Sequence, residues 1–118
     1  MSRKHAIHAA EAHVVTSHGA DFFGEDRHPL TSLTSLAGYA EGCLSHDERG
    51  PVVLLLSNPG EGGTMTPGQA AEIAPLLLKL ARHRFVRPKE SAIAHALAAA
   101  AREAEAAAEP WQWRIETA

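Results

Sequence analysis

This sequence has a single cysteine, no long apolar run and no excess of basic residues. Each of these features excludes one or more classes of protein. The single cysteine, Cys43, excludes an intrachain disulfide and a metal cluster built from the thiolates of one chain. No apolar run approaches the roughly 20 residues that span a bilayer. The first residues, MSRKHAIHAAEAH, lack the apolar stretch of a secretory signal. We therefore expect a cytoplasmic protein with no membrane partner.

The charge and length are those of one ordinary globular domain. The net charge is −3 with neutral histidines, which argues against nucleic acid as a partner because binding to phosphates requires a basic surface. The 118 residues, 45% of them hydrophobic, fit a single domain over residues 1–118. Residues 1–11 are polar and alanine-rich, and we expect a frayed helix or a flexible tail there.

Three segments have the sequence patterns of β-strands. Residues 12–17 are short and rich in β-branched side chains. Residues 52–56 are apolar without alternation, which predicts a central strand covered on both faces. Residues 111–116 alternate, with Trp111 and Trp113 on one face, and we expect this strand near an edge of the sheet.

Three further segments have helical patterns. The first starts within residues 28–32 and runs to Leu44. The second follows a capping box at Thr66, and its internal Pro75 predicts a kink or a restart. The third covers residues 89 to about 108. The resulting order, β-α-β-α-α-β, predicts an α+β domain whose small sheet of three or four strands is covered mainly on one face by three helices.

A group of histidines and carboxylates between residues 13 and 28 is the first candidate for chemistry. Imidazole and carboxylate groups together suit a transition metal or acid–base catalysis. The catalytic candidates are His18, Asp21, Asp26 and His28. The candidate metal ligands are His5, His8, His13, His18 and His28. The competing interpretation is a set of solvated histidines, because the spacing matches no known metal signature.

The glycine-rich loop over residues 58–66 is the second candidate. Free backbone N–H groups ahead of a helix can bind an anion. The loop lacks the lysine of a phosphate-binding P-loop, and Glu61 would repel phosphate, so a tight loop or hairpin competes with the ligand interpretation. The residues of this candidate anion site are Gly60, Gly62, Gly63, Thr64 and Thr66.

A basic run with no intervening acid is the third candidate. Cations here would bind a phosphate or an acidic partner. They would equally complement the dipole at a helix C-terminus, which is a purely structural role. The run consists of Lys79, Arg82, Arg84, Arg87 and Lys89.

The remaining large or reactive side chains are expected in the core. We expect Phe22 and Phe23 to fold back onto it from a loop over residues 17–26, and Cys43 to pack as a small hydrophobe. Trp111 and Trp113 are expected to fill the core as well. An aromatic edge strand can also pair with a second copy, which predicts a homodimer.

One segment resembles known sequences. Residues 17–27, SHGADFFGEDR, are similar to a group of small uncharacterised proteins from Streptomyces and related actinobacteria or their phages. The resemblance extends through Thr66-Pro67 to Trp111-Gln112-Trp113, and residues 1–11 are the part least expected to match. It implies an actinobacterial or phage source and no known activity, so it carries over no catalytic residue.

No catalytic constellation stands out, and the sequence therefore favours a non-enzymatic binding or regulatory module, acting on a second copy of itself or on another protein. The alternative is a small metal- or histidine-dependent enzyme that uses the cluster between residues 13 and 28. The second alternative is a binder of small anionic ligands at residues 58–66. No cofactor is expected under the leading hypothesis, and a transition metal is expected under the first alternative.

Overall fold

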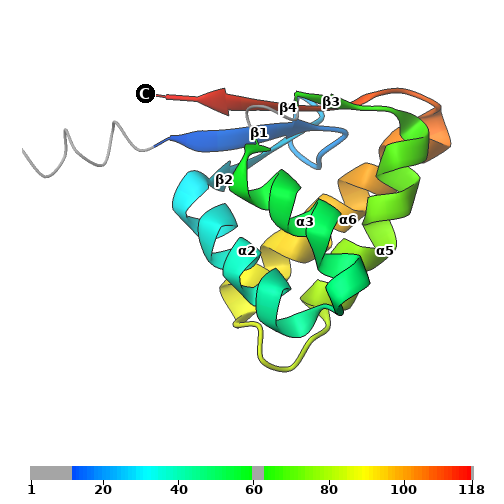
Figure 1. Ribbon diagram of the computed structural model, residues 1–118. Coiled ribbons are helices and arrows are strands. Elements are labelled where there is room, and N and C mark those ends of the chain that lie inside the picture. The colour runs from blue at the N-terminus through cyan, green and yellow to red at the C-terminus, as the bar shows by residue number, and fades with distance from the viewer. Residues whose placement is uncertain (1–11, 60–62, 118) are drawn as a thin grey trace, which may run out of the picture.

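The computed structural model describes residues 12–59 and 63–117, which form an antiparallel sheet with helices packed against one of its faces (Figure 1). The described residues contain four strands and four helices in the order β-β-α-α-β-α-α-β. The elements are β1 (His13–Ser17), β2 (Glu25–Pro29), α2 (Leu30–Cys43), α3 (His46–Ser57), β3 (Thr64–Met65), α5 (Pro67–Ala81), α6 (Pro88–Ala107) and β4 (Trp111–Glu116). The predicted α+β class is confirmed, whereas the predicted order and the predicted three helices are wrong.

The two ends of the described chain meet in the centre of the sheet. The strand order is β2-β1-β4-β3, and each neighbouring pair is antiparallel. Val14 lies opposite Ile115 and Thr16 opposite Trp113 in the β1–β4 ladder. The edge strands are β2 and β3, so the expectation that the tryptophan strand lies at an edge is wrong. A dimer that pairs through that strand therefore loses its structural basis.

The apolar segment 52–56, which we expected to be the central strand, lies in helix α3. A complete capping box starts the helix: Ser45 Oγ accepts from the N–H of Glu48 at 3.3 Å, and Glu48 Oε1 accepts from the N–H of Ser45 at 3.2 Å. Val52, Leu55 and Leu56 are buried at helical spacing. Leu54 is 67% exposed on the opposite side. The capping signal lay seven residues ahead of the apolar run, and Gly50-Pro51 hid the continuity between them.

A strand that the patterns did not indicate, β2, begins at the last two residues of the expected loop. Its sequence, Glu-Asp-Arg-His-Pro, has no apolar alternation. It forms a strand because it pairs with β1 along its whole length, from Ser17 opposite Glu25 to His13 opposite Pro29. The expected loop over residues 17–26 is therefore reduced to a short connection between two paired strands.

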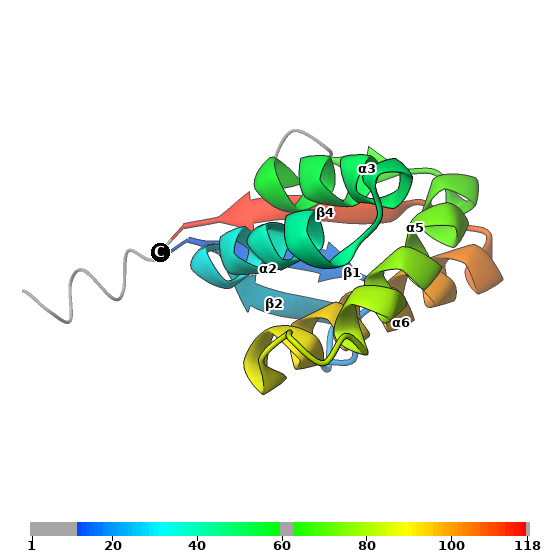
Figure 2. The same cartoon turned by 60° about the horizontal axis from the view of Figure 1, so that its bottom comes forward.

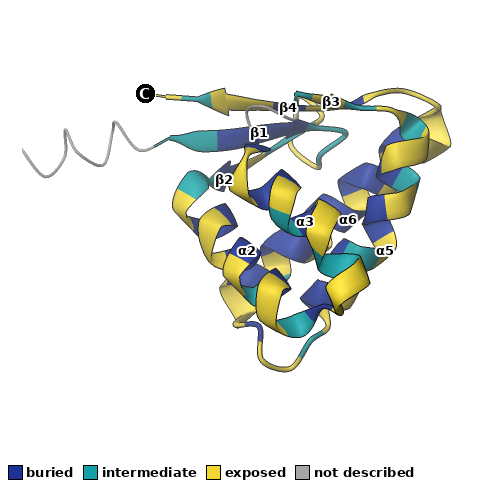
Figure 3. Ribbon diagram, viewed as in Figure 1, coloured by how far each residue is buried: buried dark blue, intermediate teal, exposed yellow. Residues whose placement is uncertain are grey.

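The core lies between the helix layer and the sheet. Figure 2 shows α5 and α6 running alongside each other, and Figure 3 shows buried residues on the sides of the helices that face inward. Buried alanines of α6, including Ala94, Ala98 and Ala101, allow this close approach. The rings of Trp111 and Trp113 are buried and meet edge to face with centroids 5.1 Å apart. Both tryptophans fill the core as predicted, and α5 runs unbroken through Pro75.

The outer face of the sheet is covered by ion pairs instead of helices. Val15 is fully buried there, between Arg27 of β2 and Arg114 of β4. Arg27 bonds to Glu116, and Arg114 Nη1 lies 2.7 Å from Glu25 Oε2. The bond to Arg27 lowers the pKa of the Glu116 carboxyl. The arginine stems cover the sheet and the charges neutralise one another, so this face offers little apolar surface to a partner.

In the residues that the structure describes, no helix is both long enough and apolar enough to cross a lipid bilayer.

Candidate interaction surfaces

The connection between β1 and β2 carries the most exposed large apolar side chains of the described chain. Phe22 is 94% exposed and Phe23 is 80% exposed. Their rings meet edge to face, with centroids 5.4 Å apart. The expectation that these two rings pack back onto the core is therefore wrong. We call residues 18–24, with Phe22 and Phe23 at its centre, the hairpin tip.

Hydrogen bonds hold the hairpin tip in one conformation. Asp21 Oδ1 accepts from the N–H groups of Phe23 at 2.8 Å and Glu25 at 2.7 Å. Asp26 Oδ1 accepts from the N–H of Ala20 at 3.0 Å. Backbone bonds from Gly19 N to the Gly24 carbonyl and from Gly24 N to the Asp21 carbonyl, 2.9 Å and 3.0 Å long, close the turn. The phenylalanines thus stand on an ordered loop although neither ring packs on the core.

Two glycines make this conformation possible. A Cβ atom on Gly19 would lie 2.3 Å from the backbone nitrogen of Asp26, so only glycine fits there without a shift of the chain. Gly24 has φ +73°, in the left-handed region that favours glycine. His18, also at positive φ (59°), adopts this region without being glycine. The backbone conformation that holds the two exposed rings therefore depends on particular residues of the loop.

The surroundings of the hairpin tip are acidic. The carboxylates of Asp21 and Asp26 support the loop itself, and Glu25 begins the next strand. Among these three, Glu25 bonds to an arginine, Arg114. Glu109 lies 3.9 Å from the ring of His18 at the base of the tip. An incoming partner therefore meets two aromatic rings flanked by negative charge.

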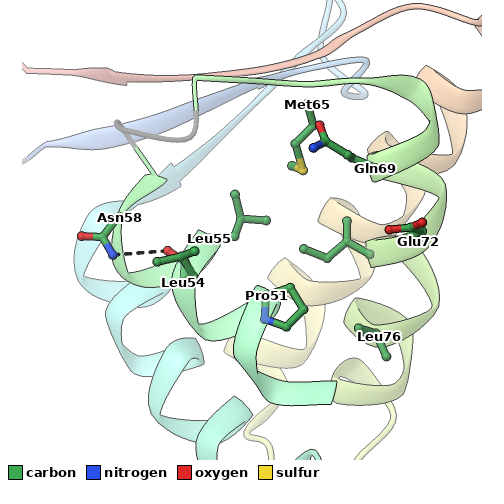
Figure 4. Close-up of a pocket in the computed structure, with 9 residues that line it drawn as sticks. Pro51, Leu54, Leu55, Asn58, Met65, Gln69, Glu72 and Leu76 are labelled. Atoms are coloured by element: carbon green, nitrogen blue, oxygen red, sulfur yellow. Dashed lines mark hydrogen bonds between the residues drawn. The ribbon is translucent and has the colours of Figure 1, made fainter. Parts of the chain in front are cut away.

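A second apolar surface lies between α3 and α5, where a groove of about 610 Å³ opens to solvent (Figure 4). Met65 of β3 lies at one end of it, and Leu54 and Leu55 project from the α3 side. The full lining is Pro51, Leu54, Leu55, Asn58, Met65, Gln69, Glu72, Ile73 and Leu76. Apolar side chains predominate, with Glu72 as the one carboxylate in this lining. We call the groove and its rims the α3–α5 face.

Charged residues border the α3–α5 face. Lys79 Nζ lies 2.8 Å and 3.0 Å from the two carboxylate oxygens of Glu48, and this bond ties α5 to α3. The hydrogen bond from Lys79 is the main cause that lowers the pKa of Glu48, and the Ser45 bonds act in the same direction. Leu54 sits on the rim and also lines a shallower hollow together with Glu41 and Arg49. The apolar surface therefore continues over α3 instead of ending in one closed pocket.

The structure separates the residues of the predicted histidine–carboxylate cluster. His18 lies at the start of the hairpin tip beside Glu109, whereas His28 is buried on the inner face of β2. Asp21 and Asp26 accept backbone hydrogen bonds in the tip. Among residues 12–59 and 63–117, no group of three or more histidine, cysteine or acidic side chains is placed to hold a metal. Of the other candidate ligands, half-buried His13 begins β1, and His5 and His8 lie outside the described residues.

His28 belongs to a buried polar group on the inner face of the sheet. Its Nε2, the hydroxyl of Thr16 and the indole nitrogen of Trp113 are all buried without a hydrogen-bond partner in the described structure. Thr16 and Trp113 are direct neighbours across β1 and β4. Burial lowers the pKa of His28, and the charge of Asp26 opposes this only in part. The imidazole is therefore neutral near pH 7.

The described part of the predicted ligand loop supports the fold. Gly60 and Gly62 lie outside the described residues. The Gly63 carbonyl accepts from the N–H of Trp113 at 2.7 Å, and Thr64 begins β3, which pairs with β4. Thr66 caps α5 through the predicted capping box, its Oγ1 3.1 Å from the N–H of Gln69. In this structure the loop joins α3 to the edge strand of the sheet.

The basic run lies at the turn between α5 and α6. Lys79 is paired with Glu48 and so belongs to the α3–α5 face. In the described part of the chain, no ion pair forms at Arg82, Arg84, Arg87 or Lys89. The guanidinium of Arg84 lies 5.0 Å from the centre of the Phe85 ring, which is 66% exposed. This end of the molecule is the basic counterpart of the acidic hairpin tip.

The hairpin tip and the α3–α5 face are the surfaces that the sequence patterns did not identify. The signal for the tip was present: glycines and an aspartate flank the two phenylalanines without any strand or helix period. The signal for the α3–α5 face was the Ser45 capping box, which would have changed the interpretation of residues 52–56 from strand to helix.

Comparison with known proteins places the chain in one family. The profile of a family described as a domain of unknown function (DUF7739) matches residues 19–114. The chain therefore belongs to that family, and residues 1–18 and 115–118 lie outside the match. No curated protein and no solved structure matches. The similarity to Streptomyces proteins stays a prediction.

Proposed function

We propose that this member of the DUF7739 family is a non-enzymatic protein-interaction module that docks onto a partner protein through Phe22 and Phe23. The observation that carries the proposal is the exposure of two large apolar rings on a loop held by Asp21, Asp26 and Gly19. An exposed apolar patch of this kind marks an interaction site in soluble proteins.

The energetics favour such a role. Burying one phenylalanine side chain in a partner contributes roughly 1.5–3 kcal/mol. Phenylalanine, like tyrosine and tryptophan, is enriched in protein–protein interfaces relative to the rest of the surface. Because hydrogen bonds already order the hairpin tip, little conformational entropy is lost when it docks. Two adjacent rings on an ordered loop are therefore suited to act as the anchor of an interface.

The chemistry around the rings indicates the kind of partner. Asp21 and Asp26 give the tip negative charge, whereas the charge of Glu25 is paired with Arg114. This charge opposes docking on an anionic membrane or on nucleic acid. The complementary surface is an apolar pocket bordered by lysine or arginine, and we propose a protein partner with such a pocket.

Photo-crosslinking inside the cells that produce the protein tests this proposal. The photoreactive residue p-benzoylphenylalanine replaces Phe22 or Phe23 in separate variants. The matched control carries it at Phe85, which is also exposed but lies at the basic turn between α5 and α6. We expect one discrete adduct from the tip positions, absent at the control position, with the linked site in an apolar pocket next to lysine or arginine.

Two outcomes would overturn the proposal. The first is the absence of any adduct at both tip positions in a protein that is folded. The second is the same set of adducts from position 85 as from positions 22 and 23, which would mean non-specific contact. Competition is measured in a lysate of the same cells: an excess of wild-type protein without the photoreactive residue should reduce the adduct yield, whereas an excess of F22S/F23S should not.

The other sequence-based hypotheses gain less support. An enzyme based on His18, Asp21, Asp26 and His28 needs these side chains in one cleft, and His28 lies on the inner face of the sheet beneath the helices. Binding of an anion at residues 58–66 needs a free helix cap, whereas Thr66 uses its hydroxyl to cap α5.

A further inference from the structure

We infer that the chain forms a homodimer in which the α3–α5 face of one copy packs on the same face of a second copy, with the two α5 helices antiparallel. The two-fold axis passes between Pro75 and Leu76 of α5. This surface is separate from the hairpin tip and is assembled from different elements, so the inference stands independently of the proposed function.

The α3–α5 face has the apolar surface that such a contact needs. Leu54 is 67% exposed on its rim, and Pro75 is exposed at the middle of α5, on the side that lines a hollow with Arg102 of α6. Leu76 is half-buried and lines the groove together with Pro51. A leucine of the second copy can enter the groove, as side chains of one helix enter the spaces between those of another. Burial of Leu54 would remove one of the most exposed apolar side chains of the described structure.

The charges on α5 are arranged symmetrically around the proposed axis. Glu72 lies three residues before Pro75, and Lys79 lies three residues after Leu76. Both side chains project towards α3: Glu72 lines the groove, and Lys79 bonds to Glu48. They are separated by about 10 Å along the helix axis. When two α5 helices run antiparallel about this axis, Glu72 of each copy meets Lys79 of the other, and Lys79 is then shared between that carboxylate and Glu48 of its own chain.

This arrangement favours a second copy over an unrelated partner. A two-fold interface brings the same patch together twice, so it must be complementary to itself. On α5, the apolar centre meets its own image, and each acidic position meets a basic one. Gln69 lies opposite Arg82, so no like charges are opposed along this helix. Glu72 has no ion pair among the described residues and is available for the second copy.

Charge reversal at positions 72 and 79 tests the dimer. The wild-type chain, E72K, K79E and the double variant E72K/K79E are each measured by sedimentation equilibrium up to about 100 µM, a concentration that populates an interface of micromolar affinity. We expect the wild type and the double variant to be dimers. E72K and K79E are each expected to be monomers, because reversal places like charges opposite each other in both symmetric pairs.

Mixing the two single variants gives the most specific result. In a mixture of E72K and K79E, one pair is reversed and the other is native, so both are attractive and a heterodimer should form from two monomeric proteins. K79E also loses its bond to Glu48, so its fold is checked by thermal unfolding, and E72K provides the same test without disturbing that bond.

Three results would overturn the inference. One is a wild-type chain that stays monomeric throughout this concentration range. Another is a dimer whose mass E72K leaves unchanged, since the interface would then lie elsewhere. The last is a mixture of folded E72K and K79E that does not associate, which would exclude the antiparallel arrangement of α5.

Discussion

The hairpin tip and the α3–α5 face both expose apolar side chains, but they are built in different ways. The tip is a short continuous segment closed by its own hydrogen bonds: the Gly19 N–H donates to the Gly24 carbonyl, and the Ala20 N–H donates to the Asp26 carboxylate. The α3–α5 face is assembled from three consecutive elements, α3, β3 and α5, and it forms only where the two helices pack against each other. The tip therefore depends on local chain conformation, and the face depends on how the helices pack.

This difference determines how each surface responds to substitution. The side chains of Phe22 and Phe23 make no contact with the core, so they can be replaced without loss of stability. The side chains of the α3–α5 face include Leu55 and Ile73, which also belong to the core. Binding and folding are thus separable at the tip and coupled at the face, and the following predictions test that contrast.

Gly19→Ala should have the largest effect. The added Cβ would lie 2.3 Å from backbone atoms of Glu25 and Asp26, so the chain must move, at a cost of roughly 1–3 kcal/mol. We expect a lower free energy of unfolding in urea, loss of crosslinking from position 22, and an unchanged dimer. A variant with wild-type stability would show that the tip is not as closely packed as described. Gly38→Ala on α2, where nothing lies within 4 Å of the added carbon, is the control.

Ser45→Ala should have the second largest effect and should act on the other surface. It removes one half of the capping box of α3, which typically costs about 1 kcal/mol. We expect weaker dimerisation in sedimentation equilibrium, because α3 carries Leu54, and unchanged crosslinking from the tip. Equal losses at both surfaces would contradict the separation between them.

His28→Leu should change how stability depends on pH. The pKa of His28 is lowered in the folded state, so below the ordinary histidine value of about 6.5 the unfolded chain binds a proton that the folded chain does not. Stability of the wild type therefore falls as the pH drops through this range, down to the lowered pKa.

Thermal unfolding of wild type and His28→Leu at about pH 7.5 and about pH 5.5 measures this contribution. The variant should lose less stability on acidification than the wild type. Identical losses in both proteins would show that the pKa of His28 is the same in the folded and the unfolded chain.

F22S/F23S should have the smallest effect on stability and a complete effect on docking. Both side chains are almost fully exposed, so the free energy of unfolding should change by no more than about 0.5 kcal/mol. The discrete crosslinked adduct, followed with the photoreactive residue at an adjacent position, should disappear. A stability loss of several kcal/mol would mean that the rings pack on the core after all.

Much of the fold followed from local signals, and the parts that failed share one cause. The Thr66 capping box, the long helix before Pro110 and the alternation at Trp111 and Trp113 were interpreted correctly, because each signal is contained in a few neighbouring residues. Strand β2 has no such pattern and forms through its pairing with β1. The apolar run of α3 fits a strand or a helix when its distant cap is ignored.

The candidate surfaces were harder to predict for the same physical reason. The exposure of Phe22 and Phe23 depends on the turn geometry set by Asp21 and Gly24, and hydrophobicity alone suggested burial. The α3–α5 face required the correct assignment of α3 as a helix. The basic run was recognised from sequence, although the pairing of Lys79 with Glu48 depends on residues far apart in the chain.

The order of the hairpin tip in the free protein is the most direct test of the central claim that two phenylalanines are held out in solvent by an ordered loop. Backbone order parameters for residues 19–25, measured by nuclear magnetic resonance relaxation, should be close to about 0.85, as for rigid backbone in general. The rings of Phe22 and Phe23 should show no contacts to Trp111 or other core side chains. Order parameters below about 0.6 in this loop, or clear contacts from either ring to the core, would contradict the account.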